Sequence, residues 1–197
     1  MSLVVWLPLN GTLENKGISN AKVTNNGATI DNAGKIGKCY SFDGSNDYLQ
    51  TSNFNPSKWP EFSITFWCYP TATFNNLFLI RGSNAHRFRI ASDGVSFRDT
   101  NNSTLRTVGL NATIPIDTWT HLTCIYNRGK ISIYINGLIT VNNTSYYRNN
   151  STFLSDLNEI RIARYTTTST SRYYSGKLND IRIYNHALSA AEVKEIA

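Results

Sequence analysis

Two aspartates that bracket a tight turn are the residues whose types and spacing best suit a metal ion. Asp43 and Asp47 enclose the tripeptide Gly44-Ser45-Asn46. Carboxylate and carbonyl oxygens on so short a turn suit a hard, oxygen-seeking cation such as Ca²⁺. The alternative is an ordinary Asp-Gly turn, whose side-chain oxygens accept hydrogen bonds from the turn's own backbone. Both interpretations stay open, and a structural Ca²⁺ is the one cofactor that the sequence suggests.

Paired carboxylates for catalysis are the next chemistry to consider. Glycoside hydrolysis needs two carboxylates that flank the bond to be cut. The closest acid pairs are Asp156 with Glu159, at the start of a predicted strand, and Glu192 with Glu195, in a predicted helix. Such positions are typical of a turn and of a helix surface. The sequence also lacks the motifs of serine hydrolases, zinc proteases and phosphate-binding loops, so we predict that the protein is not an enzyme.

Histidine and cysteine do not form a metal-binding pattern in this sequence. No Cys-x-x-Cys pair occurs, and no histidine lies at metal-ligand spacing from a cysteine. Each cysteine lies in an apolar, strand-like run, as expected for a small buried residue in a protein made in a reducing compartment. The three are Cys39, Cys68 and Cys124.

Aromatic residues in polar loops are the candidates for ligand contact. A large ring in such a loop is poorly explained as core, and exposed rings beside Asn, Asp and Arg side chains can serve as stacking platforms for sugars. The predicted carbohydrate-binding residues are Trp59, Tyr146, Tyr147, Arg148, Asn149, Tyr165, Arg172 and Tyr173. The other tryptophans, Trp6, Trp67 and Trp119, lie in strand-like segments and are expected in the core.

The elements that must position these residues are β-strands, and the clearest form a three-stranded meander over residues 117–141. In residues 118–126 and 130–136, β-branched and aromatic residues alternate, which is typical of half-buried strands. Asn127-Arg128-Gly129 separates the first two strands. Asn136-Gly137, the strongest short hairpin signal, separates the second strand from the third.

The same period of two predicts strands along the rest of the chain. Residues 62–69 carry apolar side chains on both faces and are therefore expected at the centre of a sheet. Ser189-Ala190-Ala191-Glu192 is a capping box that begins the one predicted helix. Short strands with frequent turns indicate an all-β sandwich or barrel, as one domain over residues 1–197. The further strands are predicted at 3–9, 22–24, 28–30, 39–42, 48–50, 77–81, 87–91, 94–98, 105–110, 159–163 and 177–184, with polar loops at 100–104 and 144–155.

The charge balance narrows the range of partners. The formal net charge is +6, but Lys and Arg are scattered singly and no recognition helix is predicted, so we expect no nucleic acid. A mildly basic surface would favour anionic partners such as acidic glycans. The first residues lack the basic start of a signal peptide, and no apolar run approaches the roughly 20 residues of a membrane span. We therefore expect neither a signal peptide nor membrane insertion.

Four segments in order resemble the laminin-G-like branch of the concanavalin A-like lectin/glucanase superfamily. They are GKCYSFDG at 37–44 running to DYL at 47–49, FSITFW at 62–67, WTHL at 119–122 with YING at 134–137, and GKLNDIRIYN at 176–185 followed by ALS at 187–189. The resemblance implies a jelly-roll β-sandwich of two antiparallel sheets, with both chain ends near the final strand and one short C-terminal helix. It also implies a calcium ligand near the final strand at Asp180. The Glu-x-Asp-x-x-Glu motif of the superfamily's glucanases does not occur.

This fold hosts lectins, glycosidases, adhesins and scaffold domains alike. We expect a non-catalytic carbohydrate-binding or adhesion module that recognises glycans of a cell surface or mucus. The alternative is a structural or decoration protein of a phage virion, or of another large assembly, that binds other assembly proteins and oligomerises. Related Asn-rich sequences occur in phage structural proteins and in bacterial surface proteins. The expected location is therefore a virion or an extracellular surface.

Overall fold

The computed structural model describes residues 2–56, 59–74, 77–82, 87–99, 102–145, 157–165 and 173–197. In the described part of the chain, no helix is long and apolar enough to span a membrane. The elements are β1 (Leu3–Leu7), β2 (Lys22–Asn26), β3 (Thr29–Asp31), β4 (Cys39–Asp43), β5 (Tyr48–Ser52), β6 (Glu61–Pro70), β7 (Phe78–Gly82), β8 (Arg87–Ala91), β9 (Gly94–Asp99), β10 (Asn102–Val108), β11 (Thr120–Asn127), β12 (Lys130–Ile135), β13 (Leu138–Ser145), β14 (Leu157–Ile162), β15 (Ser175–Tyr184) and α1 (Ala190–Ile196).

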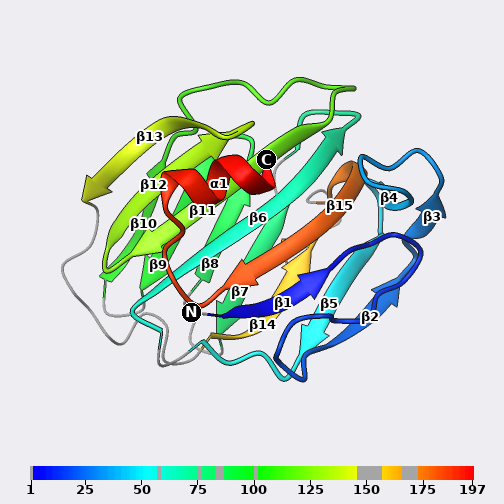
Figure 1. Cartoon of the computed structure of the whole chain (residues 1–197), viewed down its shortest axis with the longest axis horizontal. Coiled ribbons are helices and arrows are strands. Elements are labelled where there is room, and N and C mark those ends of the chain that lie inside the picture. The colour runs from blue at the N-terminus through cyan, green and yellow to red at the C-terminus, as the bar shows by residue number, and fades with distance from the viewer. Residues whose placement is uncertain are drawn as a thin grey trace.

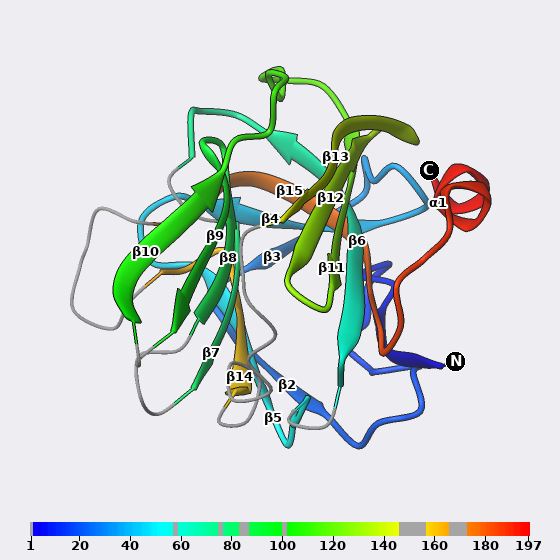
Figure 2. The ribbon, with the colours of Figure 1, turned by 90° about the vertical axis from the view of Figure 1, so that its left-hand side faces the viewer.

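Two antiparallel sheets face each other, which confirms the predicted sandwich (Figures 1 and 2). One sheet has the order β13-β12-β11-β6-β15-β4-β3, with β1 pairing β15, and the other has the order β10-β9-β8-β7-β14-β5-β2. The predicted central strand, β6, lies between β11 and β15. The N-terminal end lies beside the final strand as expected, because β1 pairs β15 and the Ser2 N–H donates to Asn185 Oδ1 over 2.8 Å.

The inward faces of the two sheets form one continuous hydrophobic core. Alternate residues of β6 point inward, and their rings meet rings from the facing sheet. Phe66 lies 6.2 Å from Phe78 of β7, and Phe62 lies 5.1 Å from Phe88 of β8, measured between ring centroids. The three cysteines are buried and free, as expected, and burial raises the pKa of the Cys68 thiol to about 12.

Local turn chemistry sets the meander of β11, β12 and β13. Arg128 and Gly129 join the first two strands with φ values of 47° and 88°. Asn136 and Gly137 join the next two with φ values of 50° and 75°, the positive pair that a two-residue hairpin requires. Both predicted turns are therefore confirmed.

Helix α1 covers part of the outer face of the eight-stranded sheet (Figure 2). Ser189 caps it, since its hydroxyl accepts from the Glu192 N–H while the Glu192 carboxylate accepts from the Ser189 N–H over 2.7 Å. The predicted capping box is thus confirmed. Buried Val193 packs with Leu188 against the strands below, which fastens the helix to the sheet.

Three sequence predictions about local structure were wrong. Residues 102–104, predicted as loop, belong to β10, and residues 144–145, also predicted as loop, belong to β13, because strand pairing uses the backbone and accepts polar residues. The core prediction fails for two tryptophans, because Trp6 and Trp119 are only partly buried. Trp67 is buried as predicted, on the face of β6 opposite to Phe66 and Cys68.

Candidate functional site

The outer face of the seven-stranded sheet gathers charged and aromatic side chains around β14. Because Ile160 and Ile162 of β14 point into the core, Glu159 and Arg161, which alternate with them, point outward. The pairing register places Arg161 opposite Gln50 of β5 and opposite Leu79 of β7, which in turn pairs with Arg89 of β8. We call this surface the outer arginine–tyrosine face; it consists of Tyr48, Arg81, Arg89, Asp93, Glu159, Arg161, Arg164, Tyr165 and Tyr173.

Ion pairs hold the guanidinium groups of this face in place. Arg161 Nε donates to Glu159 Oε1 over 2.7 Å and Nη2 donates to Oε2 over 3.2 Å, which is a bidentate pair. Arg81 Nε lies 3.8 Å from the same carboxylate. On the next strand, Arg89 Nη2 donates to Asp93 Oδ1 over 2.8 Å. These ion pairs orient the guanidinium groups of Arg161 and Arg89 on the face.

Tyrosine rings border these arginines. The Arg164 guanidinium lies 4.4 Å from the centre of the Tyr48 ring and 5.7 Å from that of Tyr173, and Arg164 also pairs with Tyr173 in an isolated β-bridge. The Arg89 guanidinium lies 5.8 Å from the centre of the Tyr165 ring. All three rings are partly exposed. The face thus combines apolar ring surfaces with charged hydrogen-bonding groups.

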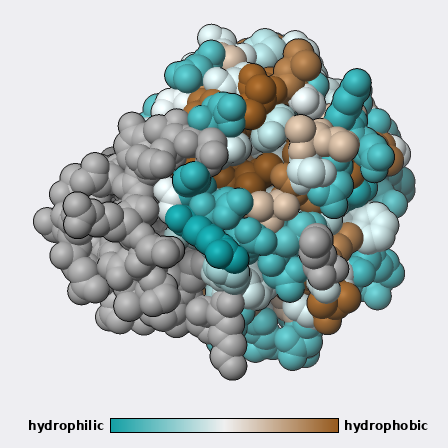
Figure 3. All heavy atoms as spheres, turned by 60° about the vertical axis from the view of Figure 1, so that its left-hand side comes forward, coloured by the Kyte–Doolittle hydropathy of each residue, from teal (hydrophilic) through white to brown (hydrophobic). Residues whose placement is uncertain are grey.

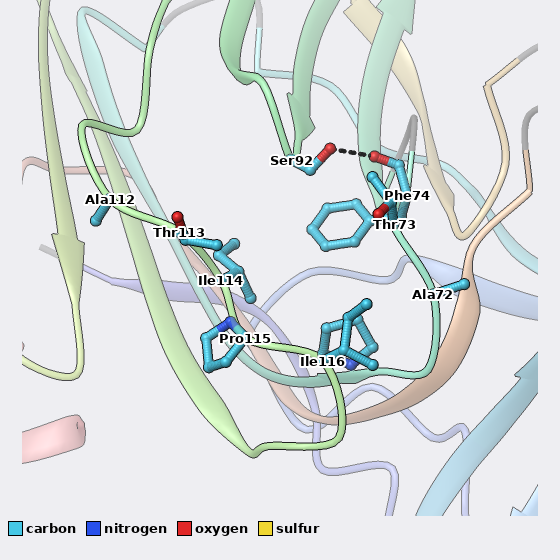
Figure 4. A pocket seen from close by; sticks show the side chains of 10 residues that line it. Ala72, Thr73, Phe74, Ser92, Ala112, Thr113, Ile114, Pro115 and Ile116 are labelled. Atoms are coloured by element: carbon cyan, nitrogen blue, oxygen red, sulfur yellow. Dashed lines mark hydrogen bonds between the residues drawn. The ribbon is translucent and has the colours of Figure 1, made fainter.

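A second candidate is an apolar hollow of about 490 Å³ at one end of the sandwich. It lies between the segment that follows β6, the β8–β9 turn and residues 112–116, and the side chains of Phe74 and Ile114 point toward one another across it (Figure 4). The Ser92 hydroxyl is already used, because it donates to the Phe74 carbonyl oxygen over 2.5 Å. Figure 3 shows hydrophobic side chains gathered in a hollow on this side of the molecule, with hydrophilic ones around it. The hollow offers few directional polar groups, so we rank it second.

The turn predicted to bind calcium is held by its own hydrogen bonds. Asp43 Oδ1 accepts from the N–H groups of Ser45, Asn46 and Asp47 over 2.8, 3.2 and 3.4 Å. These N–H donors lower the pKa of the Asp43 carboxyl. Asp47 Oδ2 accepts from the Asp43 N–H over 3.0 Å, and burial raises the pKa of Asp47. This geometry matches the Asx-turn alternative.

Asp180 does not complete a calcium site with that turn. Its carboxylate accepts from Trp6 Nε1 over 2.7 Å and lies 2.8 Å from an Arg182 guanidinium nitrogen. Among the described residues, no group of three or more His, Cys, Asp or Glu side chains could hold a metal ion. The residues present therefore do not form a set of six to eight oxygen ligands, and calcium binding stays a prediction.

The structure brings some of the predicted carbohydrate-binding residues together and separates others. Tyr165 and Tyr173 both lie on the outer arginine–tyrosine face. Trp59 lies elsewhere: it packs on the core with its ring 5.6 Å from that of Phe54. The remaining predicted residues lie outside the described part of the chain; these are Tyr146, Tyr147, Arg148, Asn149 and Arg172.

Sequence reasoning missed the strand residues of the face. Arg87-Phe88-Arg89-Ile90 and Glu159-Ile160-Arg161-Ile162 alternate charged with apolar residues, which places the charges of each strand on one face. The same pattern predicts the two strands and indicates that each has a charged face. Only the strand order shows that the two segments share one sheet.

The family model of the concanavalin A-like lectin/glucanases superfamily matches residues 43–194. Domain 4 of AbnA, a GH43 extracellular arabinanase from Geobacillus stearothermophilus solved with arabinotriose, is similar with a TM-score of 0.82 at 18% identity, covering 100% of this chain and 98% of that chain. The botulinum neurotoxin serotype D binding domain is similar with a TM-score of 0.71 at 15% identity, covering 99% and 51%. A structure of botulinum neurotoxin type C, titled for interaction with two ganglioside molecules, has a TM-score of 0.71 at 18% identity, covering 99% and 50%.

These likenesses support the fold, because the identities are low. The chain spans about half the length of the toxin domains and nearly all of the arabinanase domain. Comparison with curated proteins finds no match. The family model covers most of the sequence, and the resemblance seen in the sequence segments is confirmed. The chain therefore belongs to the concanavalin A-like lectin/glucanases superfamily, in its laminin-G-like branch.

Proposed function

We propose that the protein is a non-catalytic carbohydrate-binding module that acts in adhesion at a virion or extracellular surface. The observation that carries this proposal is the outer arginine–tyrosine face, where three partly exposed rings lie beside four guanidinium groups and two carboxylates. A sugar presents an apolar ring face and a rim of hydroxyls, so it needs both kinds of partner. The similar arabinanase domain, which was solved with arabinotriose, supports the same class of ligand.

The positions of the carboxylates support a role without catalysis. Glu159 is paired with Arg161 and Arg81 on the seven-stranded sheet. Glu192 belongs to the cap of α1, which lies on the outer face of the other sheet. Glu159 and Glu192, on opposite outer faces, therefore cannot flank one glycosidic bond, and Asp93, the other carboxylate of the outer arginine–tyrosine face, is paired with Arg89. Asp156, the other acid considered beside Glu159, lies outside the described residues.

The test is a glycan array with the purified protein, in calcium and in chelator. We expect binding that weakens roughly 2- to 10-fold in Tyr165→Ala, the range that an aromatic contact contributes. Tyr165→Phe keeps the ring and should bind as the unmodified protein does. Tyr69→Ala, a partly exposed ring on the eight-stranded sheet, is the matched control. A blank array in both conditions would contradict the proposal, whereas loss in chelator alone would support a calcium site.

The second candidate is a structural or decoration protein of a phage virion or other large assembly. The favouring observation is β13, an edge strand on which Leu138 and Ile139 keep 73% and 47% of their surface exposed. Exposed apolar residues on a sheet edge promote pairing with another chain. The mass in solution distinguishes this candidate, because an assembly unit should oligomerise and Leu138→Lys should return it to a monomer. A monomer at all concentrations, together with glycan binding, would favour the first candidate.

A further inference from the structure

We propose that the apolar hollow at the end of the sandwich is a saccharide subsite that selects sugars carrying a methyl group, as deoxysugars and N-acetylated sugars do. The inference rests on the proposed carbohydrate-binding function and adds a second contact region with the chemical class of sugar that it takes.

The hollow has the size of a small-molecule site and an apolar floor. Its volume of about 490 Å³ lies within the range of roughly 300–1,000 Å³ that is typical of ligand pockets. Phe74 and Ile114, which are buried, point toward one another across it, and the exposed Ile116 adds apolar surface (Figure 4). A methyl group placed between these side chains would leave water and gain contact with carbon atoms.

The polar groups of the hollow are few and neutral. Among the described residues that line it none is charged, and its hydroxyl groups are those of Thr73, Thr113 and Ser92. The Ser92 hydroxyl already donates to the Phe74 carbonyl oxygen. A sugar hydroxyl that enters such a site gives up its bonds to water and gains few partners, which weakens binding. A sugar with a methyl or acetamido group in place of that hydroxyl is therefore favoured.

The hollow adjoins the outer arginine–tyrosine face at the β8–β9 turn. Ser92 of this turn lines the hollow, and the next residue, Asp93, accepts from Arg89 of the face over 2.8 Å. Strand pairing through β7 brings Ile162, at the end of β14, level with Ile90 of β8. The rings that follow β14 thus lie toward the same end of the sheet as the hollow. A saccharide chain resting on the face can continue past the turn and place its next residue in the hollow.

The experiment compares sugars that differ only at the methyl-bearing group, by NMR titration of the backbone amides. The pairs are triacetylchitotriose against cellotriose, and L-fucose against L-galactose, so that acetyl and deoxy sources of the methyl group are distinguished. Acetamide alone tests whether an apolar group suffices without a sugar. We expect one methyl-bearing sugar to bind at least about fourfold more tightly than its partner, the factor that one buried methyl group supplies. Its amide shifts should include Phe74 and Ile114.

Variants connect this preference to the hollow. Ile116→Asp places a charge in the lining at an exposed position, so it should fold, and we expect it to reduce the preference to less than about twofold while cellotriose binds as before. Ile116→Ser should act in the same direction. Ile18→Asp, at an exposed isoleucine whose N–H donates to the Leu3 carbonyl oxygen beside β1, is the matched control and should keep the preference. Tyr165→Ala should weaken both trisaccharides by the same factor, because its ring lies on the face outside the hollow.

The outcomes separate this inference from the proposed function. Equal binding within both pairs overturns the selectivity of the hollow and leaves the carbohydrate function standing. No binding of any saccharide overturns both. A preference that survives Ile116→Asp, or that is lost in Ile18→Asp, overturns the role of the hollow. Acetamide that binds as tightly as the acetylated trisaccharide would show an unselective apolar site and would also overturn the inference.

Discussion

Replacing Asn179 with Asp should destabilise the fold, because one buried amide joins three segments. Asn179 is fully buried on β15. Its Oδ1 accepts from the Ile36 N–H over 2.7 Å, and its Nδ2 donates to the Pro8 and Lys38 carbonyl oxygens over 2.9 and 3.0 Å. An ionised carboxylate keeps the first bond but cannot donate, so both carbonyls lose their donor. At about 1–3 kcal/mol for each buried group, Asn179→Asp should lower the free energy of unfolding by about 2–6 kcal/mol at pH 7.

The destabilisation caused by Asn179→Asp should depend on pH, in a direction set by the pKa of the introduced carboxyl. Burial and two facing carbonyls raise the pKa of the introduced carboxyl in the folded state above its unfolded value. The penalty is then full above the folded pKa and shrinks as the pH falls through that value, because the protonated carboxyl can donate one bond. Urea denaturation at pH 7 and pH 4.5 measures both effects, each against the unmodified protein at the same pH. Asn158→Asp, at an exposed position on β14, is the control. A loss below about 1 kcal/mol at pH 7 would refute the reasoning.

Three further changes test other parts of the structure. Ser189→Ala removes the cap of α1 and should cost about 1 kcal/mol in urea denaturation, with faster amide exchange confined to the helix; an unchanged stability would contradict the capping role. Burial lowers the pKa of His121 to about 4, although Asp180 opposes the shift. Between pH 6.5 and 4 the unfolded chain therefore binds more protons than the folded chain. Lowering the pH from 6.5 to 4 should reduce the free energy of unfolding by up to about 3 kcal/mol, and His121→Gln should flatten this pH profile. An equally steep profile in His121→Gln would argue against this role of His121. Arg161→Met combined with Glu159→Leu replaces a largely buried ion pair by apolar groups and should keep or raise stability, by up to about 4 kcal/mol, while glycan binding weakens; a strongly destabilised variant would mean that the pair serves the fold.

The sequence predicted the elements whose signals are local. Asn136-Gly137 and Ser189-Glu192 specify their turn and cap through their own chemistry, and both are confirmed. The first residues of β10 were missed because Asn, Ser and Thr give no apolar alternation, and their pairing with β9 uses only the backbone. Period two also divides a strand into two faces without saying which face is inward. Trp67 is buried as predicted, but on the face of β6 opposite to Phe66 and Cys68, which line the core between the sheets.

The candidate site was harder to predict because it depends on pairing between distant strands. Tyr165 and Tyr173 were predicted from their loop positions, and both lie on the outer arginine–tyrosine face. Their partners come from elsewhere: Arg164 contacts the ring of Tyr48, and Arg161 lies opposite Gln50. No local pattern reports that β5 and β14 are neighbours. Trp59 is the opposite case, because it is predicted to bind carbohydrate but packs on the core. A loop residue can fold back on the core, and only the tertiary structure shows it.

The two outer faces of the sandwich differ in how their side chains are covered. On the eight-stranded sheet, apolar Ile125 and Tyr134 are covered by α1, which hides them from water. On the seven-stranded sheet, in the part of the chain that the structure describes, no helix covers the outer face, and β14 carries a largely buried ion pair whose Arg161 Nη1 makes no hydrogen bond. Apolar residues of similar volume would hold such a sheet at least as well as a buried ion pair does. If the pair gives no gain in stability, recognition explains its presence better than folding does, and the Arg161 and Glu159 double variant separates the two.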